Sequence, residues 1–171
     1  RLRRFVQASR AVQTIADIIV AGNFDLVHSA MAWGHLYGGR AARRARRPAV
    51  WFQHVGASWT SGLEAAAALV KARTILANSA FTAARQARVN PRRIPVTVVH
   101  PGTRLPAEPR AVRRARGRTA LGIRKDEFAV GIVARLQTGK GQDVVIRAAA
   151  SLLRARRHAR LFVVGDALFG L

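Results

Sequence analysis

The chain contains no cysteine and only 8 acidic residues among its 171. Without thiols it forms neither disulfides nor a cysteine-ligated zinc site. Charged residues interrupt its longest apolar runs well before 18 residues, which excludes a membrane-spanning helix. It has no segment with the pattern of a signal peptide, so we expect a cytoplasmic protein. Half of the residues are apolar, which excludes a disordered tail.

Basic residues outnumber acidic ones by 30 to 8, which gives a formal net charge of +22. Only Lys71, Lys125 and Lys140 are lysines, so arginine supplies most of the positive charge. Such a charge attracts polyanions such as nucleic acid, anionic lipid or nucleotide phosphates. The arginines are nevertheless spread over several segments without interleaved aromatic residues, which is more typical of solvated helix faces. Charge alone therefore identifies no partner.

Helix-like and strand-like segments alternate along the sequence. Helical spacing of apolar residues and stop signals such as Pro48 predict helices at 6–20, 30–47, 63–71, 80–88, 110–121 and 141–157. Short apolar runs predict strands at 24–28, 49–53, 74–77, 95–99, 128–133 and 161–164. Ser79 is the expected N-cap of the helix at 80–88. The alternation predicts an α/β fold with parallel sheets covered by helices.

Three prolines and a glycine fall between residues 101 and 109, which marks the best linker candidate. We therefore expect one domain at 1–100, a linker at 101–109 and the beginning of a second domain at 110–171.

Polar residues follow most of the predicted strands. In open parallel sheets, ligands bind beyond the carboxyl ends of the strands. The residues at these ends are His28, His54, Asn78, His100, Arg135 and Asp166. Strand ends are also polar because they meet water, so the pattern indicates a ligand-binding α/β protein and no particular reaction.

The segment 128–143 is the sharpest local feature. It places Arg135 just after a strand and Lys140 just before a helix. Gly139 and Gly141 flank Lys140. Glycines let backbone N–H groups approach a ligand, and a helix start attracts anions. Arginine binds two oxygens at once, whereas lysine supplies a point charge. The segment therefore predicts a phosphate or diphosphate site.

Other chemistries are poorly supported. The ATPase P-loop needs a glycine where Ala134 stands and a hydroxyl where Gly141 stands, and the dinucleotide fingerprint lacks its third glycine. The acidic residues form no evident catalytic pair, and there is neither a metal-ligand motif nor a serine nucleophile elbow.

The ordered motifs resemble those of family 4 retaining glycosyltransferases with the GT-B fold, over nearly the whole chain. They are Phe24–His28, Ala49–Ser58, Ile75–Ser79, Val98–Gly102, Gly131–Asp143 and Leu161–Asp166. The resemblance implies two Rossmann-like domains, of which residues 1–100 are the later part of the acceptor-side domain and 110–171 begin the donor-side domain. It also implies a UDP- or GDP-sugar donor, a sugar or lipid-linked acceptor, and no metal or other cofactor.

The resemblance also assigns roles to residues. Arg135 and Lys140 would contact the donor diphosphate and stabilise charge on the leaving group, as such cations do. His54 matches the family's histidine near the transferred sugar and is the catalytic candidate. The expected cleft-lining residues are Gly102, Asn78 and Asp166.

Two parts of the family pattern are missing from this sequence. The family's glycine-rich loop would lie before Arg1. The family's two glutamates, separated by seven residues, would lie later in the donor-side domain, but this sequence has no glutamate after Glu127. We therefore expect a fragment lacking both ends that is inactive, or nearly so, alone.

Two further hypotheses remain open. The alternative function is a basic nucleic-acid-binding module, which predicts steeply salt-dependent binding without preference for UDP or GDP. Arginine-rich helices at 40–47 and 110–118 would let the glycosyltransferase dock peripherally on the anionic inner face of the membrane, although their amphipathicity is poor.

Overall fold

The computed structural model describes residues 2–156 and 158–167. The chain consists of two compact units, Arg1–Thr103 and Arg104–Leu171. The boundary falls inside the proline-rich segment 101–109.

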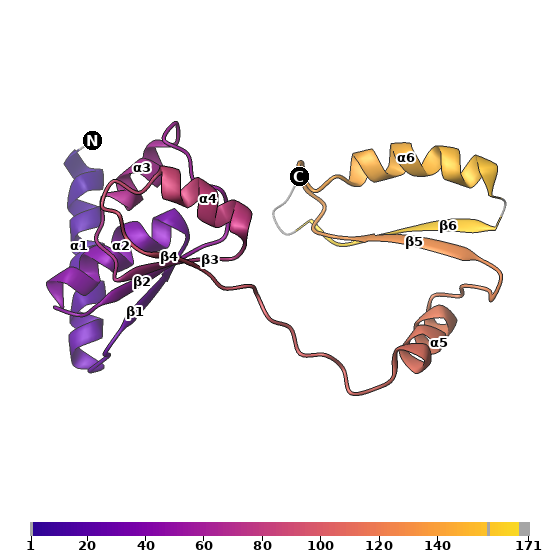
Figure 1. Cartoon of the computed structure of the whole chain (residues 1–171), viewed down its shortest axis with the longest axis horizontal. Coiled ribbons are helices and arrows are strands. Elements are labelled where there is room, and N and C mark those ends of the chain that lie inside the picture. Colours follow the sequence, from indigo (N-terminus) through magenta and orange to yellow (C-terminus); the bar gives the residue numbers. More distant parts are fainter. Residues whose placement is uncertain (1, 157, 168–171) are drawn as a thin grey trace. The chain divides into compact units, whose positions relative to one another are not determined.

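Unit 1 is built on a four-stranded sheet in which every neighbouring pair of strands is parallel (Figure 1). The strands lie in the order β1-β2-β3-β4, with bounds β1 Val27–Ala30, β2 Ala49–Gln53, β3 Thr74–Ala77 and β4 Val96–Val98. Helices join successive strands, as parallel pairing requires. All four carboxyl ends therefore meet at one edge of the sheet.

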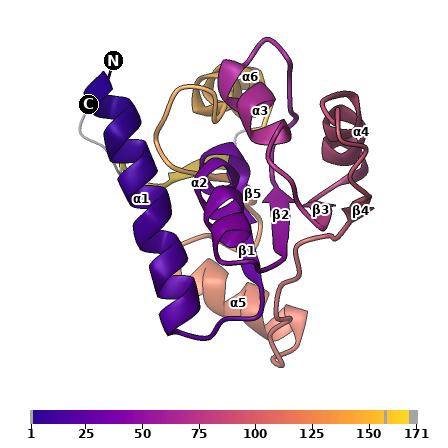
Figure 2. The same ribbon diagram turned by 90° about the vertical axis from the view of Figure 1, so that its left-hand side faces the viewer.

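Four helices accompany this sheet: α1 Leu2–Ala21, α2 Met31–Arg44, α3 Gly62–Ala68 and α4 Ala80–Arg88. Helix α2 lies against β1 and β2, α4 lies against β3 and β4, and α1 runs beside α2 (Figure 2). Helix α4 begins where predicted, because the Ser79 hydroxyl accepts a hydrogen bond from the Thr82 backbone N–H at 3.2 Å.

The core of unit 1 contains a buried imidazole. The ring of His35 stacks on Trp51 with centroids 4.5 Å apart, and both side chains are fully buried. Its Nδ1 lies 2.9 Å from Ser29 Oγ, and its Nε2 lies 3.2 Å from the Val70 carbonyl oxygen. A carbonyl only accepts hydrogen bonds, so Nε2 carries the proton. Burial lowers the pKa of His35, an effect partly opposed by the bond to Val70, so the ring is neutral at pH 7.

The first strand is displaced from its predicted position. We expected a strand at 24–28 ending in His28, but β1 is Val27–Ala30 and His28 is its second residue, so that prediction is wrong. Val27 pairs with Ala49, the first residue of β2. The ladder cannot extend further back along β2 because Pro48 lacks an N–H group. Pairing with β2, and not the apolar run itself, sets where β1 begins.

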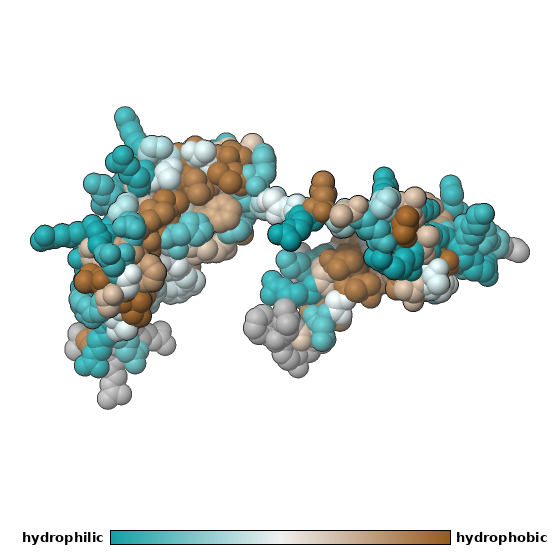
Figure 3. All heavy atoms as spheres, turned by 90° about the horizontal axis from the view of Figure 1, so that it is seen from below, coloured by the Kyte–Doolittle hydropathy of each residue, from teal (hydrophilic) through white to brown (hydrophobic). Residues whose placement is uncertain are grey.

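Unit 2 contains α5 Arg110–Ala120, β5 Phe128–Val133, α6 Gln142–Ala155 and β6 Ala159–Val164. Its two strands, β5 and β6, pair with each other in parallel, and α6 connects them. Ala149 is the one buried hydrophobic residue among the described part of this unit. Large apolar side chains such as Phe128 and Val133 are exposed, and brown side chains lie open on its surface in Figure 3. The α/β class with parallel sheets and flanking helices is thus confirmed in both units.

Candidate functional site

The carboxyl edge of the unit 1 sheet brings His54 and Asn78 together. His54 directly follows β2, and Asn78 directly follows the neighbouring β3. The side-chain amide of Asn78 donates a hydrogen bond to the His54 backbone carbonyl at 3.0 Å. The exposed imidazole of His54 meets the ring of Phe52 edge-on, with centroids 4.2 Å apart. His54 is therefore held at its backbone and along one ring edge, at the position where a ligand would bind.

A buried amide network that sequence reasoning missed supports this edge. Gln53 donates hydrogen bonds through Nε2 to Glu64 Oε2 at 2.8 Å and to Gln86 Oε1 at 3.2 Å. Gln86 in turn donates to the Val89 carbonyl at 2.9 Å. Burial raises the pKa of Glu64, and the hydrogen bond from Gln53 opposes that shift. The network joins α3, α4 and the end of β2, and the one hint in the sequence was a glutamine in an otherwise apolar strand.

The segment after β4 is open. Gly102 is exposed, and a Cβ built on it would meet nothing within 4 Å. His100 is exposed as well. Neither residue is held against the His54–Asn78 pair by a hydrogen bond within the described residues.

At the carboxyl edge of unit 2, the loop that begins at Arg135 lies beside Asp166. The Leu136 N–H donates to the Asp166 carbonyl at 3.1 Å, which joins the two loops just beyond β5 and β6. Gly165 makes this approach possible, because a Cβ there would lie 1.8 Å from the Ala134 carbonyl oxygen. Its φ of +156° also favours glycine.

The loop from Arg135 leads into the start of α6. The Gln142 side chain donates to the Arg135 carbonyl at 2.6 Å, which ties the first helical residue back to the strand end. Gly139 and Gly141 both have left-handed backbones, with φ of +87° and +81°. No side chain in the described part of the chain caps α6, so its first N–H groups are available to a ligand.

An open hollow of about 720 Å³ lies at this helix start. Its lining residues are Leu136, Gln137, Thr138, Gly139, Gly141, Gln142, Asp143 and Val144. Arg135 and Lys140 bracket the loop that lines the hollow, but neither side chain is part of the lining. The diphosphate role of these two cations therefore stays a prediction.

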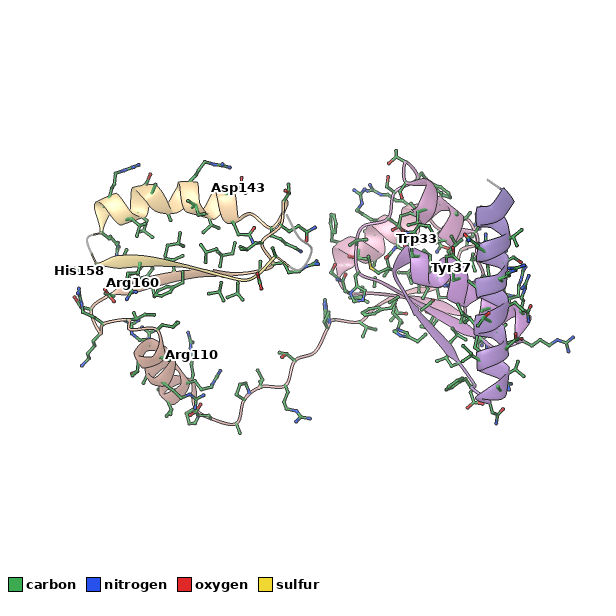
Figure 4. All side chains as sticks on the ribbon, turned by 180° about the vertical axis from the view of Figure 1, so that it is seen from behind. Trp33, Tyr37, Arg110, Asp143, His158 and Arg160 are labelled. Atoms are coloured by element: carbon green, nitrogen blue, oxygen red, sulfur yellow. The ribbon has the colours of Figure 1, made fainter. Side chains whose placement is uncertain are left out.

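One acidic residue, Asp143, lines the same hollow. Asp143 lies in the first turn of α6 (Figure 4) and pairs with Arg147 at 2.7 Å. A carboxylate here repels an incoming anion, and the ion pair with Arg147 offsets that repulsion.

Within residues 2–156 and 158–167, no cluster of three or more His, Cys, Asp or Glu side chains is arranged to hold a metal ion. Across the same residues, none of the helices is both long and apolar enough to span a membrane.

Comparison with known proteins adds independent information. The sequence model of Glycosyltransferase Family 4 matches residues 1–106. A D-inositol 3-phosphate glycosyltransferase of Mycobacterium marinum is 46% identical over 65 residues, which is 38% of this chain and 13% of that protein. The corresponding protein of Segniliparus rotundus is 41% identical over 54 residues, 32% of this chain and 12% of that protein.

Solved structures share the fold. The Anabaena protein HepE in complex with UDP and glucose superimposes with a TM-score of 0.71 at 27% identity, covering 95% of this chain and 44% of HepE. HepE in complex with UDP-glucose gives a TM-score of 0.70 at 26% identity, with the same coverage. This chain thus spans less than half the length of HepE. Because the family model covers more than half of the sequence, the chain belongs to Glycosyltransferase Family 4.

Proposed function

We propose that this chain is part of a glycosyltransferase that moves a sugar from a UDP- or GDP-sugar to a sugar or lipid-linked acceptor, with retention of anomeric configuration. Unit 1 contributes the acceptor side and unit 2 the beginning of the donor side. The enzyme works in the cytoplasm, at the inner face of the membrane when its acceptor is lipid-linked.

The observation that carries this proposal is the loop at residues 135–142. It combines a strand end, two left-handed glycines and an uncapped helix start, which together present backbone N–H groups to an anion. HepE, which shares this fold, is described in complexes with UDP and with UDP-glucose. A diphosphate is therefore the ligand that best fits the loop.

The chemistry needs positive charge at the leaving group. In sugar transfer the bond between the anomeric carbon and the diphosphate oxygen breaks, and the electron pair remains on that oxygen. An acceptor hydroxyl oxygen bonds to the anomeric carbon, and its proton passes to the departing diphosphate. In this proposal Arg135, at the start of the loop, and Lys140, near its end, stabilise the negative charge on the departing diphosphate without a metal ion. Fixed charges of this kind act more strongly on the transition state than on the bound donor.

The other site residues have positioning or contact roles in this proposal. His54 contacts the transferred sugar from the acceptor side, and Asn78 holds its backbone. Gly102 lies where the chain passes from one unit to the other, and Asp166 borders the loop that carries Arg135.

Calorimetric titration of UDP and GDP against this chain tests the proposal. We expect one nucleotide to bind, and Lys140→Ala to weaken that binding about tenfold or more, because it removes a charge-assisted contact to phosphate. Lys125→Ala is the matched control, since Lys125 is an exposed lysine of the same unit outside the loop. Equal loss in both variants, or no binding of either nucleotide, would contradict the assignment.

Duplex DNA provides the comparison with the alternative function. The nucleotide site predicts that Lys140→Ala leaves DNA binding unchanged. A nucleic-acid-binding module predicts the reverse, with DNA affinity falling steeply as salt rises and no preference for either nucleotide.

The isolated 171-residue chain is expected to turn over no donor, or almost none. Sugar transfer and donor hydrolysis can both be assayed with UDP- and GDP-sugars. Robust turnover would contradict this expectation while leaving the nucleotide-binding assignment intact.

A further inference from the structure

Unit 1 contains a hollow of about 860 Å³, which lies at the edge of its sheet opposite to His54. It is lined by the last part of α2, by the connections that lead into β2, β3 and β4, and by Ala49, the first residue of β2. We call it the basic hollow, because its lining includes seven cations: Arg43, Arg46, Arg47, Lys71, Arg73, Arg92 and Arg93. Its lining contains no acidic and no aromatic residue.

These cations lack partners of opposite charge. All six ion pairs in the described part of the chain lie in unit 2. Unit 1 has only three acidic residues, Asp17, Asp25 and Glu64, and none of them lines the basic hollow. Seven positive charges around one cavity repel one another, and no ion pair among the described residues offsets that repulsion.

Arg47 shows this at the level of one atom. Its side chain is half-buried and donates through one terminal nitrogen to Asn23 Oδ1 at 3.3 Å. Its Nε is buried without a hydrogen-bond partner among the described residues. A buried donor without a partner costs free energy, and a ligand oxygen would satisfy it.

Backbone conformation gives a second, independent observation. Arg46 and Arg93 have left-handed backbones, with φ of +54° and +49°. Side-chain-bearing residues rarely adopt this conformation, which costs about 1 kcal/mol or more and concentrates at ligand-binding sites. Glycine would fit both positions without strain. Both positions instead carry arginine, which adds a positive charge to the lining of the hollow at each strained residue.

From these observations we infer that the basic hollow binds a compact, multiply charged phosphate anion, at a site separate from the sugar-transfer cleft. The cavity volume is that of a small-ligand site. Arginines from three connections converge on it, and arginine grips phosphate oxygens in pairs. Without aromatic residues in its lining, it offers no stacking surface for nucleic-acid bases. The phosphate groups belong either to a free polyphosphate or to an anionic lipid headgroup.

The first experiment titrates inorganic tripolyphosphate into the 171-residue chain at low and at physiological salt. We expect binding that weakens with salt, because exposed charges are screened. The arginines are then removed with Arg46→Gly plus Arg93→Gly, which relieves the backbone strain while deleting two charges. We expect this pair to weaken tripolyphosphate binding about tenfold or more without lowering the melting temperature.

The matched control is Arg10→Gln plus Arg88→Gln. It removes two exposed charges from the same unit outside the hollow, so we expect tripolyphosphate affinity to change less than about threefold. Arg46→Asn plus Arg93→Asn repeats the test with a residue that also tolerates the left-handed conformation. Equal weakening by the hollow and the control variants, or no tripolyphosphate binding at all, would overturn the inference.

Vesicles of one part phosphatidylglycerol to three parts phosphatidylcholine separate the two phosphate sources. Vesicle binding that is lost in the Arg46 and Arg93 variants assigns the hollow to a headgroup. Tripolyphosphate binding without vesicle binding assigns it to a free anion. Duplex DNA bound through the same two arginines, with no binding of tripolyphosphate, would overturn the inference in favour of a nucleic-acid surface.

Discussion

The side-chain amide of Asn78 holds the backbone carbonyl of His54 at 3.0 Å, across the carboxyl ends of two neighbouring parallel strands. This bond links the catalytic candidate to a residue 24 positions later in the sequence. His54 follows β2 and is exposed, so little besides this bond and the Phe52 ring restrains it. Asn78 therefore acts as a positioning residue for His54.

Asn78→Ala is expected to lower the free energy of unfolding of unit 1 by about 1 kcal/mol, because it removes one hydrogen bond. It should also change the NMR chemical shifts of the His54 ring. Ser61→Ala is the control, since it removes the N-cap of α3 at a similar cost but leaves the hydrogen bond from Asn78 to His54 in place. Unchanged His54 resonances in Asn78→Ala would contradict the positioning role.

Gly165→Ala is expected to disturb the loop that carries Arg135. The new Cβ would lie 1.8 Å from the Ala134 carbonyl oxygen, so the ends of β5 and β6 must separate. We expect a loss of about 2 kcal/mol in the stability of unit 2 and weaker UDP or GDP binding. Gly131→Ala within β5 is the control, because its Cβ would lie 3.9 Å from the nearest atom. Denaturant unfolding and nucleotide titration of both variants provide the measurement.

Most of the fold could be predicted because its signals are local. The sequence correctly predicted the bounds of β2 and β5 from their apolar runs, and it correctly predicted Ser79 as the N-cap of α4. The start of β1 could not be placed, since it depends on pairing with Ala49 after Pro48. Local patterns locate elements, whereas ladder register comes from another part of the chain.

The sites also divide into features that the sequence predicts and features that depend on distant parts of the chain. Parallel strands put the loops that carry Arg135 and Asp166 at one edge, so the contact between these loops could be predicted from the order of strands and helices. The basic hollow could not be anticipated, because its cations come from three separate connections. His35 also escaped notice, since a histidine in a helix gives no sign that it will stack on Trp51 in a core.

The stability of unit 1 should depend on pH through His35. Its pKa is lowered in the fold by burial, relative to about 6.5 in the unfolded chain. Below pH 6.5 the unfolded chain therefore takes up a proton that the folded protein resists. The contribution of His35 is complete above pH 6.5 and is lost as pH falls from 6.5 toward the folded pKa. Urea unfolding between pH 7.5 and pH 5 measures this slope.

His35→Gln is the control for the pH prediction, because it removes the titrating ring, and its unfolding should depend less on pH in this range. Glu64 has a raised pKa, so it contributes a slope of the opposite sign near its own titration. Glu64→Gln in both backgrounds removes that contribution. If His35→Gln retains the full slope, another group causes it.

The two units are expected to unfold in separate transitions, unit 2 first. Of the seventeen buried hydrophobic residues in the part of the chain that the structure describes, sixteen lie in unit 1, and Ala149 is the remaining one. Burial of apolar surface supplies most of the folding free energy, so the opening of β5, β6 and α6 should cost much less than the opening of β2 and β3. Hydrogen exchange of backbone amides measures both costs: protection should be high around Trp51 and Ile75 and low around Ile132 and Phe162. Equal protection in the two units, with a single denaturant transition, would mean that the exposed apolar faces of unit 2 are covered in solution.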